Sequence, residues 1–180
     1  MRKLLNEELD RLEIGAFKDS VKLPVVVVLD NVRSLNNIGS VFRTSDSFRL
    51  ESIMLCGITA TPPHKDIHKT ALGATESVDW SYHKNTLDAI HALKKDGYAI
   101  ISVEQVEGAV MLESFSADPG AKYALVFWHE MRGVQQAVVD VSDICLEIPQ
   151  YGTKHSLNIS VAAGIVIWEV FKQMASKLVR

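Results

Sequence analysis

Cysteine and long apolar runs are scarce in this 180-residue sequence. Its two cysteines, Cys56 and Cys145, lie far apart without CxxC spacing, which argues against a disulfide scaffold or a zinc knuckle. A reducing cytoplasm therefore fits best. Residues 1–17 alternate charge with leucine and lack the apolar run of a signal peptide, and no segment reaches about 18 uninterrupted apolar residues. The sequence predicts neither a secretory leader nor a membrane span.

An excess of positive charge is also missing. The formal net charge is -3 and the charged fraction is 23%, which are ordinary values for a globular protein. The chain as a whole therefore lacks the excess of positive charge that is typical of nucleic-acid-binding proteins. Any contact with RNA or DNA must therefore come from a local patch or from a second subunit.

The common nucleotide-binding and nucleophile motifs are absent as well. Residues 30–39 read DNVRSLNNIG after the first apolar run, where a dinucleotide-binding protein has GxGxxG. The chain also lacks GxxxxGK[ST] and GxSxG. These absences argue against a Rossmann oxidoreductase, a P-loop NTPase and an α/β-hydrolase.

Short apolar runs and helical patterns alternate along the chain, of which 47% is hydrophobic. The runs are short and apolar on both faces, as buried parallel strands are. They lie at 24–29, 52–56, 98–103, 123–127 and, as a fifth candidate, 144–148. Helical periodicity covers 38–48 and 87–94. The order predicts an open, mostly parallel α/β sheet flanked by helices, in a single domain with residues 1–20 as a helical N-terminal extension.

The last segment, from Ser156 to Arg180, reads as one long helix. Its first half is apolar almost all round, from Ile159 to Trp168. A helix of this kind needs burial on more than one side. We expect it to pack into the core and against another subunit.

Three polar segments follow predicted strands and carry the functional argument. In segment 1 (residues 31–49), either Asn36 or Asn37 is a suitable helix N-cap. Arg43 lies off the apolar stripe of the same helix, so it is either a solvated arginine or a group aimed at an anion. Both interpretations of Arg43 stay open at this point.

Segments 2 (residues 124–133) and 3 (residues 148–160) have the same character. Gly133 suits a positive φ or a close approach to a ligand, and Glu130 suits a first helical turn. Ser156 or Asn158 could cap the last helix. Because loops at one edge of a sheet can converge on a single pocket, the three segments together predict one site.

These residues resemble the SpoU, or TrmH-like, branch of the SPOUT RNA 2′-O-ribose methyltransferases over about residues 22–172. The resemblance rests on Asn-x5-Arg (Asn37 and Arg43) combined with Ser-Leu-Asn-x-Ser-Val-Ala at 156–162, and a further similar stretch covers 61–75. It implies a C-terminal deep trefoil knot, an exception to the rule against threaded chains. It also implies an obligate homodimer that methylates tRNA or rRNA, with the size of the chain favouring a compact tRNA region.

The resemblance also implies a cofactor and site residues. S-adenosyl-L-methionine would bind in the knot, at Phe127, Trp128, His129, Gly133, Ile148, Pro149, Ser156 and Leu157. The catalytic set would be Arg43, Asn37, Glu130, Ser156 and Asn158. RNA would meet Asn31, Arg33, Ser34, Asn37, Arg43, His68 and Lys69. A guanidinium with a pKa above about 12 is a poor base, so we expect Arg43 to hold phosphate and stabilise negative charge.

One departure from the family keeps an alternative open. The chain has Trp128-His129-Glu130 where the family usually has Gly-Asn/Ser-Glu, and glycine normally lets backbone approach the cofactor. The protein could therefore be a knotted RNA-binding or assembly protein with weak or lost turnover. A different α/β enzyme with Ser156 or Cys56 as nucleophile is a second alternative, but it lacks a placed base.

The only metal-like spacing is the pair His64 and His68, four residues apart. The sequence offers no third ligand nearby, so we expect no metal site. With Lys65 and Lys69, the pair could instead form part of a basic patch that faces RNA.

Overall fold

Seven strands form one sheet in this computed structural model, which describes residues 1–128 and 133–178, apart from the side chain of Asn6. The strand order is β3-β2-β1-β6-β4-β7-β5, and every pairing among the described strands is parallel. The strands are β1 Leu23–Asp30, β2 Leu50–Cys56, β3 Asp79–His83, β4 Tyr98–Val103, β5 Val110–Met111, β6 Lys122–Trp128 and β7 Ile144–Glu147. The predicted parallel α/β sheet is confirmed.

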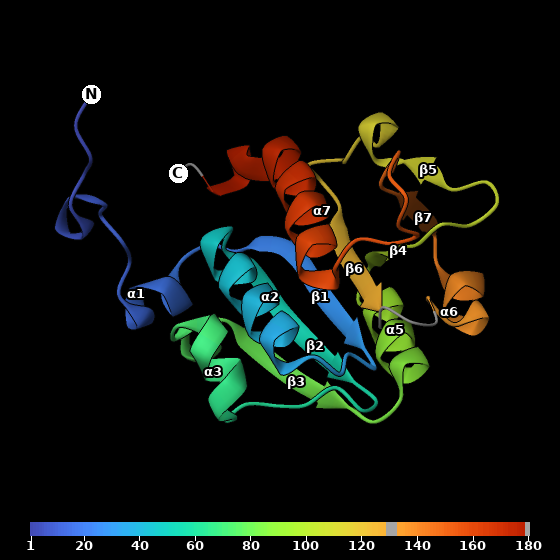
Figure 1. Cartoon of the computed structure of the whole chain (residues 1–180), viewed down its shortest axis with the longest axis horizontal. Helices are drawn as coiled ribbons and strands as arrows, with labels where there is room; N and C mark the ends of the chain where they lie inside the picture. The colour runs from blue at the N-terminus through green and yellow to red at the C-terminus, as the bar shows by residue number, and fades with distance from the viewer. Residues whose placement is uncertain (129–132, 179–180) are drawn as a thin grey trace.

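Helices cover both faces of this sheet (Figure 1). They are α1 Ile14–Asp19, α2 Leu35–Ser47, α3 Lys65–Ala71, α4 Ala74–Ser77, α5 Thr86–Lys95, α6 Gln136–Val141 and α7 Ile159–Met174. Single 3-10 turns lie at Asn6–Glu8, Leu112–Ser114 and Ala175–Leu178. Helices α2 and α7 lie on one face, and α5 and α6 lie on the other.

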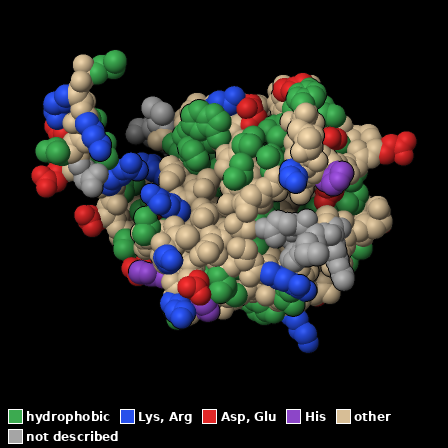
Figure 2. Space-filling model, viewed as in Figure 1, with side chains coloured by type: hydrophobic (Ala, Val, Ile, Leu, Met, Phe, Trp, Pro, Cys, Tyr) green, Lys and Arg blue, Asp and Glu red, His purple; other side chains and the backbone are tan. Residues whose placement is uncertain are grey.

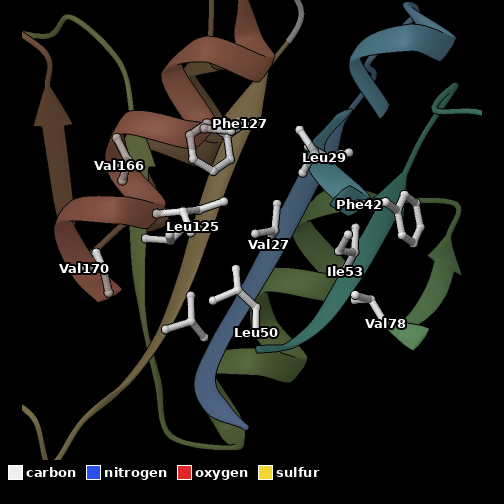
Figure 3. Packing of buried hydrophobic residues seen from close by; sticks show 14 of the residues in the cluster. Val27, Leu29, Phe42, Leu50, Ile53, Val78, Leu125, Phe127, Val166 and Val170 are labelled. Atoms are coloured by element: carbon white, nitrogen blue, oxygen red, sulfur yellow. The ribbon is translucent and has the colours of Figure 1, made fainter. Parts of the chain in front are cut away.

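The pleat of β1 divides the core between these two faces. Val25, Val27 and Leu29 are fully buried on the side of α2 and α7, as Figure 3 shows for Val27 and Leu29. Val26 and Val28 are buried on the side of α5 and α6. Burial of each such side chain contributes about 1.5–3 kcal/mol relative to exposure. This two-sided burial explains why β1 lacks the apolar and polar alternation of a surface strand.

Helix α2 begins two or three residues earlier than the expected cap would place it. The N-cap is Ser34, whose Oγ accepts a hydrogen bond from the backbone N–H of Asn37 at 3.3 Å. The prediction that Asn36 or Asn37 caps this helix was therefore wrong. Farther along, α2 packs closely on α3 at Gly39. A Cβ at this position would lie only 2.3 Å from the carbonyl oxygen of Ile67, so glycine permits the close contact.

Helix α7 is shorter than the predicted helix over 156–180. It begins at Ile159 and ends at Met174, where a 3-10 turn follows. By length and composition alone, Ile159–Leu178 could cross a membrane, a test that core helices also pass. Here Ala163, Val166 and Val170 are buried in the core, two of them labelled in Figure 3. Helix α7 therefore serves as a core helix of this fold.

The N-terminal arm (residues 1–20) lies beside the sheet rather than in it, and its first residues extend away from the body in Figure 1. Only Asn6–Glu8 and Ile14–Asp19 are helical within the expected helical extension. Phe17 is the buried anchor of the arm, and the apolar side chains of Leu5 and Leu12 are exposed. The trefoil knot stays a prediction.

Candidate functional site

The three polar segments follow strands whose carboxyl ends lie at one edge of the sheet. Asp30 at the end of β1 is paired in register with Trp128 at the end of β6. Segment 3 follows β7, which pairs with β4, and β4 in turn pairs with β6. This edge is where ligands bind in open α/β sheets.

A side-chain hydrogen bond joins segments 1 and 3 directly. The Asn158 amide nitrogen donates to the Asn37 carbonyl oxygen at 3.2 Å, and Asn37 is only 9% exposed. The other end of the Asn158 amide accepts from the backbone N–H of Ser160 at 2.9 Å and so caps α7. Asn158 is therefore the cap that the sequence allowed, and it also holds α7 against α2.

A pocket opens beside this contact, at the ends of β4, β6 and β7. Its volume is about 100 Å³. The lining residues are Val103, Glu104, Gln105, Phe127, Trp128, Leu146, Ile148, Gln150, His155, Ser156, Leu157, Ile159 and Ala162. Five of the predicted cofactor residues line it: Phe127, Trp128, Ile148, Ser156 and Leu157. The lining does not include Gly133 and Pro149, while His129 and Glu130 lie outside the described residues.

Glu104 is the pocket residue that the sequence argument missed. Its carboxylate accepts the backbone N–H of Gln105 at 2.8 Å and that of Val134 at 2.7 Å. The preceding Gly133 has φ +65°, as predicted, and a Cβ there would lie 2.6 Å from Glu104 Oε2. Glu104 therefore fixes the backbone just after segment 2. The signal was available, since Glu104 directly follows β4 at the same edge of the sheet.

The structure does not bring Arg43 to this pocket within one protomer. Arg43 is exposed on α2 and lines a separate groove beside the N-terminal arm. It stands six residues after Asn37, which is about 9 Å along the helix and about a third of a turn round it. Among the described residues, the lining of the pocket and the lining of the groove have no member in common.

The remaining predicted RNA contacts fall into two groups. Arg33, His68 and Lys69 are exposed and available to a ligand. Asn31 is used within the protein, because its Oδ1 accepts the backbone N–H of Ile58 at 3.1 Å and its Nδ2 donates to Asp30 Oδ1 at 2.6 Å. Ser34, the last of these predicted contacts, is likewise used within the protein, as the α2 cap described above. Its Oγ is therefore engaged in the first turn of the helix.

A buried carboxylate lies under the same edge. Asp30 is fully buried, and its Oδ1 accepts from Thr86 Oγ1 at 2.5 Å, whereas its Oδ2 has no hydrogen-bond partner in the described structure. Burial raises the pKa of Asp30 to about 6, although hydrogen bonds from Thr86 and Asn31 oppose the rise. The indole Nε1 of Trp128, in the paired register position, is also buried and has no partner within residues 1–128 and 133–178.

Cys56 lies next to this carboxylate and cannot act as a nucleophile near neutral pH. Burial, together with the negative charge of Asp30, raises the pKa of the Cys56 thiol to about 12. A thiolate is the reactive form of cysteine, and the side chain has no access to solvent. This geometry argues against Cys56 as the nucleophile of a different α/β enzyme.

The pair His64 and His68 has no third metal ligand in the part of the chain that the structure describes. His64 caps α3, because its Nδ1 accepts the backbone N–H of Asp66 at 3.2 Å. Within residues 1–128 and 133–178, no group of three or more His, Cys, Asp or Glu side chains could hold a metal ion. His64 therefore serves as a helix cap in the described structure.

Comparison with known sequences gives a consistent family match. The model of the SpoU rRNA methylase family matches residues 24–168. A protein of Staphylococcus haemolyticus, assigned to the TrmH family of tRNA/rRNA methyltransferases, is 30% identical over 160 residues. The match covers 89% of this chain and 63% of the relative, so the chain spans less than two thirds of the relative's length.

Solved structures with the same fold include two bacterial enzymes. The TrmH/SpoU tRNA modifying enzyme of A. aeolicus has a TM-score of 0.78 and 25% identity, covering 89% of this chain and 80% of its own. The AdoMet-bound rRNA methyltransferase of Sinorhizobium meliloti has a TM-score of 0.77 and 24% identity, covering 86% and 61%. The described sheet and its helices therefore have the arrangement found in these enzymes.

Proposed function

Because the chain belongs to the SpoU rRNA methylase family, we propose that it methylates a ribose 2′-hydroxyl in tRNA or rRNA with S-adenosyl-L-methionine as methyl donor. The observation that carries the proposal is the Asn37–Asn158 contact beside the pocket, which joins segments 1 and 3. The names of the relatives support an RNA substrate, and the cofactor of the S. meliloti enzyme supports the donor. We further infer that residues 1–180 act as one domain in the cytoplasm, where Cys56 and Cys145 stay free thiols.

The pocket residues fit this donor in their chemistry. Phe127, Ile148 and Leu157 supply apolar walls for a nucleoside, and Ser156 and Glu104 supply polar groups for its hydroxyls and amine. Among the described residues, the buried indole Nε1 of Trp128 has no hydrogen-bond acceptor, which leaves one N–H donor at the end of β6. When bound, S-adenosylmethionine supplies an electrophilic methyl group. These side chains would orient it and exclude water.

We infer that a second copy of the chain completes the site. Arg43 lies in a groove away from the pocket of its own protomer, so a symmetric dimer could bring the Arg43 of one copy to the pocket of the other. Helix α7 offers an exposed apolar stripe for such a dimer, with Val161, Ile165 and Trp168 spaced four and three residues apart. The C-terminal knot remains part of the proposed fold.

In this proposal Arg43 acts by charge and position. Its guanidinium would hold an RNA phosphate with two parallel N–H donors and stabilise the negative charge that develops on the ribose oxygen. Asn37, fixed by Asn158, would position the nucleotide or the arginine. Ser156 and Glu130 complete the proposed catalytic set, with Glu130 outside the described residues.

The test combines mapping with two substitutions. Total RNA from cells with and without the protein should differ by at least one 2′-O-methylated nucleotide, and the absence of any lost site would overturn the proposal. Arg43→Ala should lower kcat/KM by about 100-fold or more, and Arg43→Lys by at least about tenfold, because lysine lacks the planar fork. Cofactor affinity, measured by calorimetry, should stay unchanged. Near wild-type turnover of Arg43→Lys would contradict the bidentate role.

A second candidate function is a knotted RNA-binding or assembly protein without turnover. The pocket of about 100 Å³ is smaller than the roughly 300 Å³ at which typical small-molecule sites begin, and Trp128 forms part of its wall. Calorimetric titration with S-adenosylmethionine separates the two functions. Binding supports the enzyme, and no heat of binding at millimolar cofactor favours the assembly protein.

A further inference from the structure

A large groove separates the N-terminal arm from the body of the protein. Its volume is about 790 Å³, and it lies between α1 on one side and α2 and α4 on the other. Three arginines line it: Arg11 from the arm, Arg43 from α2 and Arg49 just after α2. Figure 2 shows blue Lys and Arg side chains gathered where the arm meets the body. Because the whole chain has a net charge of -3, this clustering is a local feature.

The three guanidiniums of the groove have no charged partner in the part of the chain that the structure describes. None of them takes part in an ion pair or a side-chain hydrogen bond among the described residues. Two carboxylates, Asp10 and Asp46, also line the groove, and Asp46 Oδ1 accepts a hydrogen bond from Ser77 Oγ at 2.5 Å. The charged groups of the lining therefore sum to a positive charge, and none of the described residues occupies the guanidinium N–H donors that an anion would need.

Arg49 adds an independent observation, because its backbone is left-handed at φ +49°. Its N–H donates to the Asp46 carbonyl at 3.0 Å, and its carbonyl accepts from the Leu23 N–H at 2.8 Å. These two hydrogen bonds fix the backbone of the turn between α2 and β2. Glycine or asparagine fits such a position with less strain than arginine. The strained position thus holds a long cationic side chain at the groove, which points to a role for the guanidinium.

We propose that Arg49, together with Arg11 and Arg43, binds backbone phosphates of the RNA substrate in this groove. The inference rests on the proposed function, which supplies RNA as the partner. Guanidinium groups match phosphate oxygens with two parallel donors, and RNA presents phosphates in a row along its backbone. Arg43 would then bind one of several phosphates in the groove. Arg49 and Arg11 would bind the neighbouring phosphates and so fix which nucleotide of the RNA lies at Arg43.

The test uses the full chain and fluorescein-labelled bulk bacterial tRNA. Arg49→Gly and Arg49→Asn remove the charge and suit the left-handed backbone, so both variants should have a higher Tm than the wild type. Both should nevertheless bind the tRNA roughly 5- to 10-fold more weakly at moderate salt, with the slope of log K against log salt reduced by about 1. Arg49→Lys keeps the charge and should retain most of the affinity.

The matched control is Lys95→Ala, which removes one exposed positive charge on α5, a helix on the opposite face of the sheet. Its affinity and salt slope should equal those of the wild type. If Arg49→Gly and Lys95→Ala bind the tRNA equally well, the phosphate groove is overturned, whether or not the wild type methylates RNA. If Arg49→Gly binds weakly while the wild type shows no cofactor binding in calorimetry, the groove stands and the methyltransferase proposal fails.

Discussion

At the scale of single residues, Asp30 couples stability to pH. Its pKa is about 6 in the folded chain against an ordinary value of 3.8, so the folded state holds the proton more tightly. The stability that this gives is complete below about pH 4 and is lost as the pH rises through 6. The buried charge therefore costs up to about 3 kcal/mol at neutral pH.

Asp30→Asn should remove this dependence. The variant keeps an oxygen that can accept from Thr86 and carries no charge, so its free energy of unfolding at pH 8 should exceed that of the wild type. At pH 4 the two proteins should be nearly equal. Urea unfolding at pH 4, 6 and 8 measures both curves, and a constant difference across this range would contradict the role of Asp30.

Glu104 carries the second prediction at this scale. Glu104→Gln replaces a carboxylate that accepts two backbone N–H groups with an amide that offers one good acceptor. The hydrogen bond from the Val134 N–H should weaken, which should lower the free energy of unfolding by about 1–2 kcal/mol. Calorimetry should show weaker binding of S-adenosylmethionine. The control is Glu107→Gln, an exposed neighbour on the same loop. Equal cofactor affinity in the two variants would rule out a positioning role for Glu104.

Sequence reasoning at residue scale succeeded where geometry is local. The positive φ of Gly133 and the cap at Asn158 follow from what each residue type allows. The cap of α2 fell to Ser34 instead of Asn36 or Asn37, because several adjacent polar residues compete for one position. Glu104 and the fixed amide of Asn31 depend on partners 30 and 27 positions away, which no local pattern reveals.

At the scale of elements, the buried parallel strands were predictable because they are continuous apolar runs. Strand β3 escaped prediction, since at the edge of the sheet its residues are mostly exposed and polar, and β5 has only two residues. The overlong prediction for α7 has a related cause. Residues 148–158 form the loop that leads from β7 to α7, and hydrophobic periodicity cannot locate where such a loop ends and the helix begins.

Asn158 gives the prediction at element scale, because its two roles are separable. Asn158→Asp keeps the oxygen that caps α7 and removes the N–H that reaches Asn37, so stability should change by less than about 1 kcal/mol while turnover falls. Asn158→Ala loses both roles and should also cost about 1–2 kcal/mol of stability.

The control for these variants is Asn85→Ala, which removes an ordinary cap from α5, a helix on the opposite face of the sheet. It should lower stability by about 1 kcal/mol, and turnover measured well below its Tm should stay close to the wild type. Chemical denaturation and steady-state assays give the two quantities. Full activity in Asn158→Asp would mean that the bond to Asn37 has no part in the site.

At the scale of the whole molecule, the exposed face of α7 predicts association. Trp168 is 49% exposed and stacks on Phe171 with ring centroids 5.7 Å apart, so it presents a large rigid surface for a partner. Trp168→Glu should convert the proposed homodimer to a monomer and abolish methylation, because in the proposed dimer each site takes Arg43 from the other copy.

Light scattering and an RNA methylation assay measure the two effects. The control is Ile58→Glu, which places the same charge at another exposed apolar residue, one that is 60% exposed. It should leave the mass of the particle unchanged. A monomeric wild type, or a dimeric Trp168→Glu, would place the subunit contact elsewhere.

The order of strands in the sheet also constrains how the chain can assemble as it leaves the ribosome. Strands β1, β2 and β3 can pair as soon as they are synthesised, but β4 bonds only to β6 and β7, and the free side of β1 also waits for β6. Until residue 128 is translated, the all-valine stretch of β1 therefore has an open edge. This edge of β1 therefore has to be kept from pairing with strands of other chains through more than half of the synthesis of the protein.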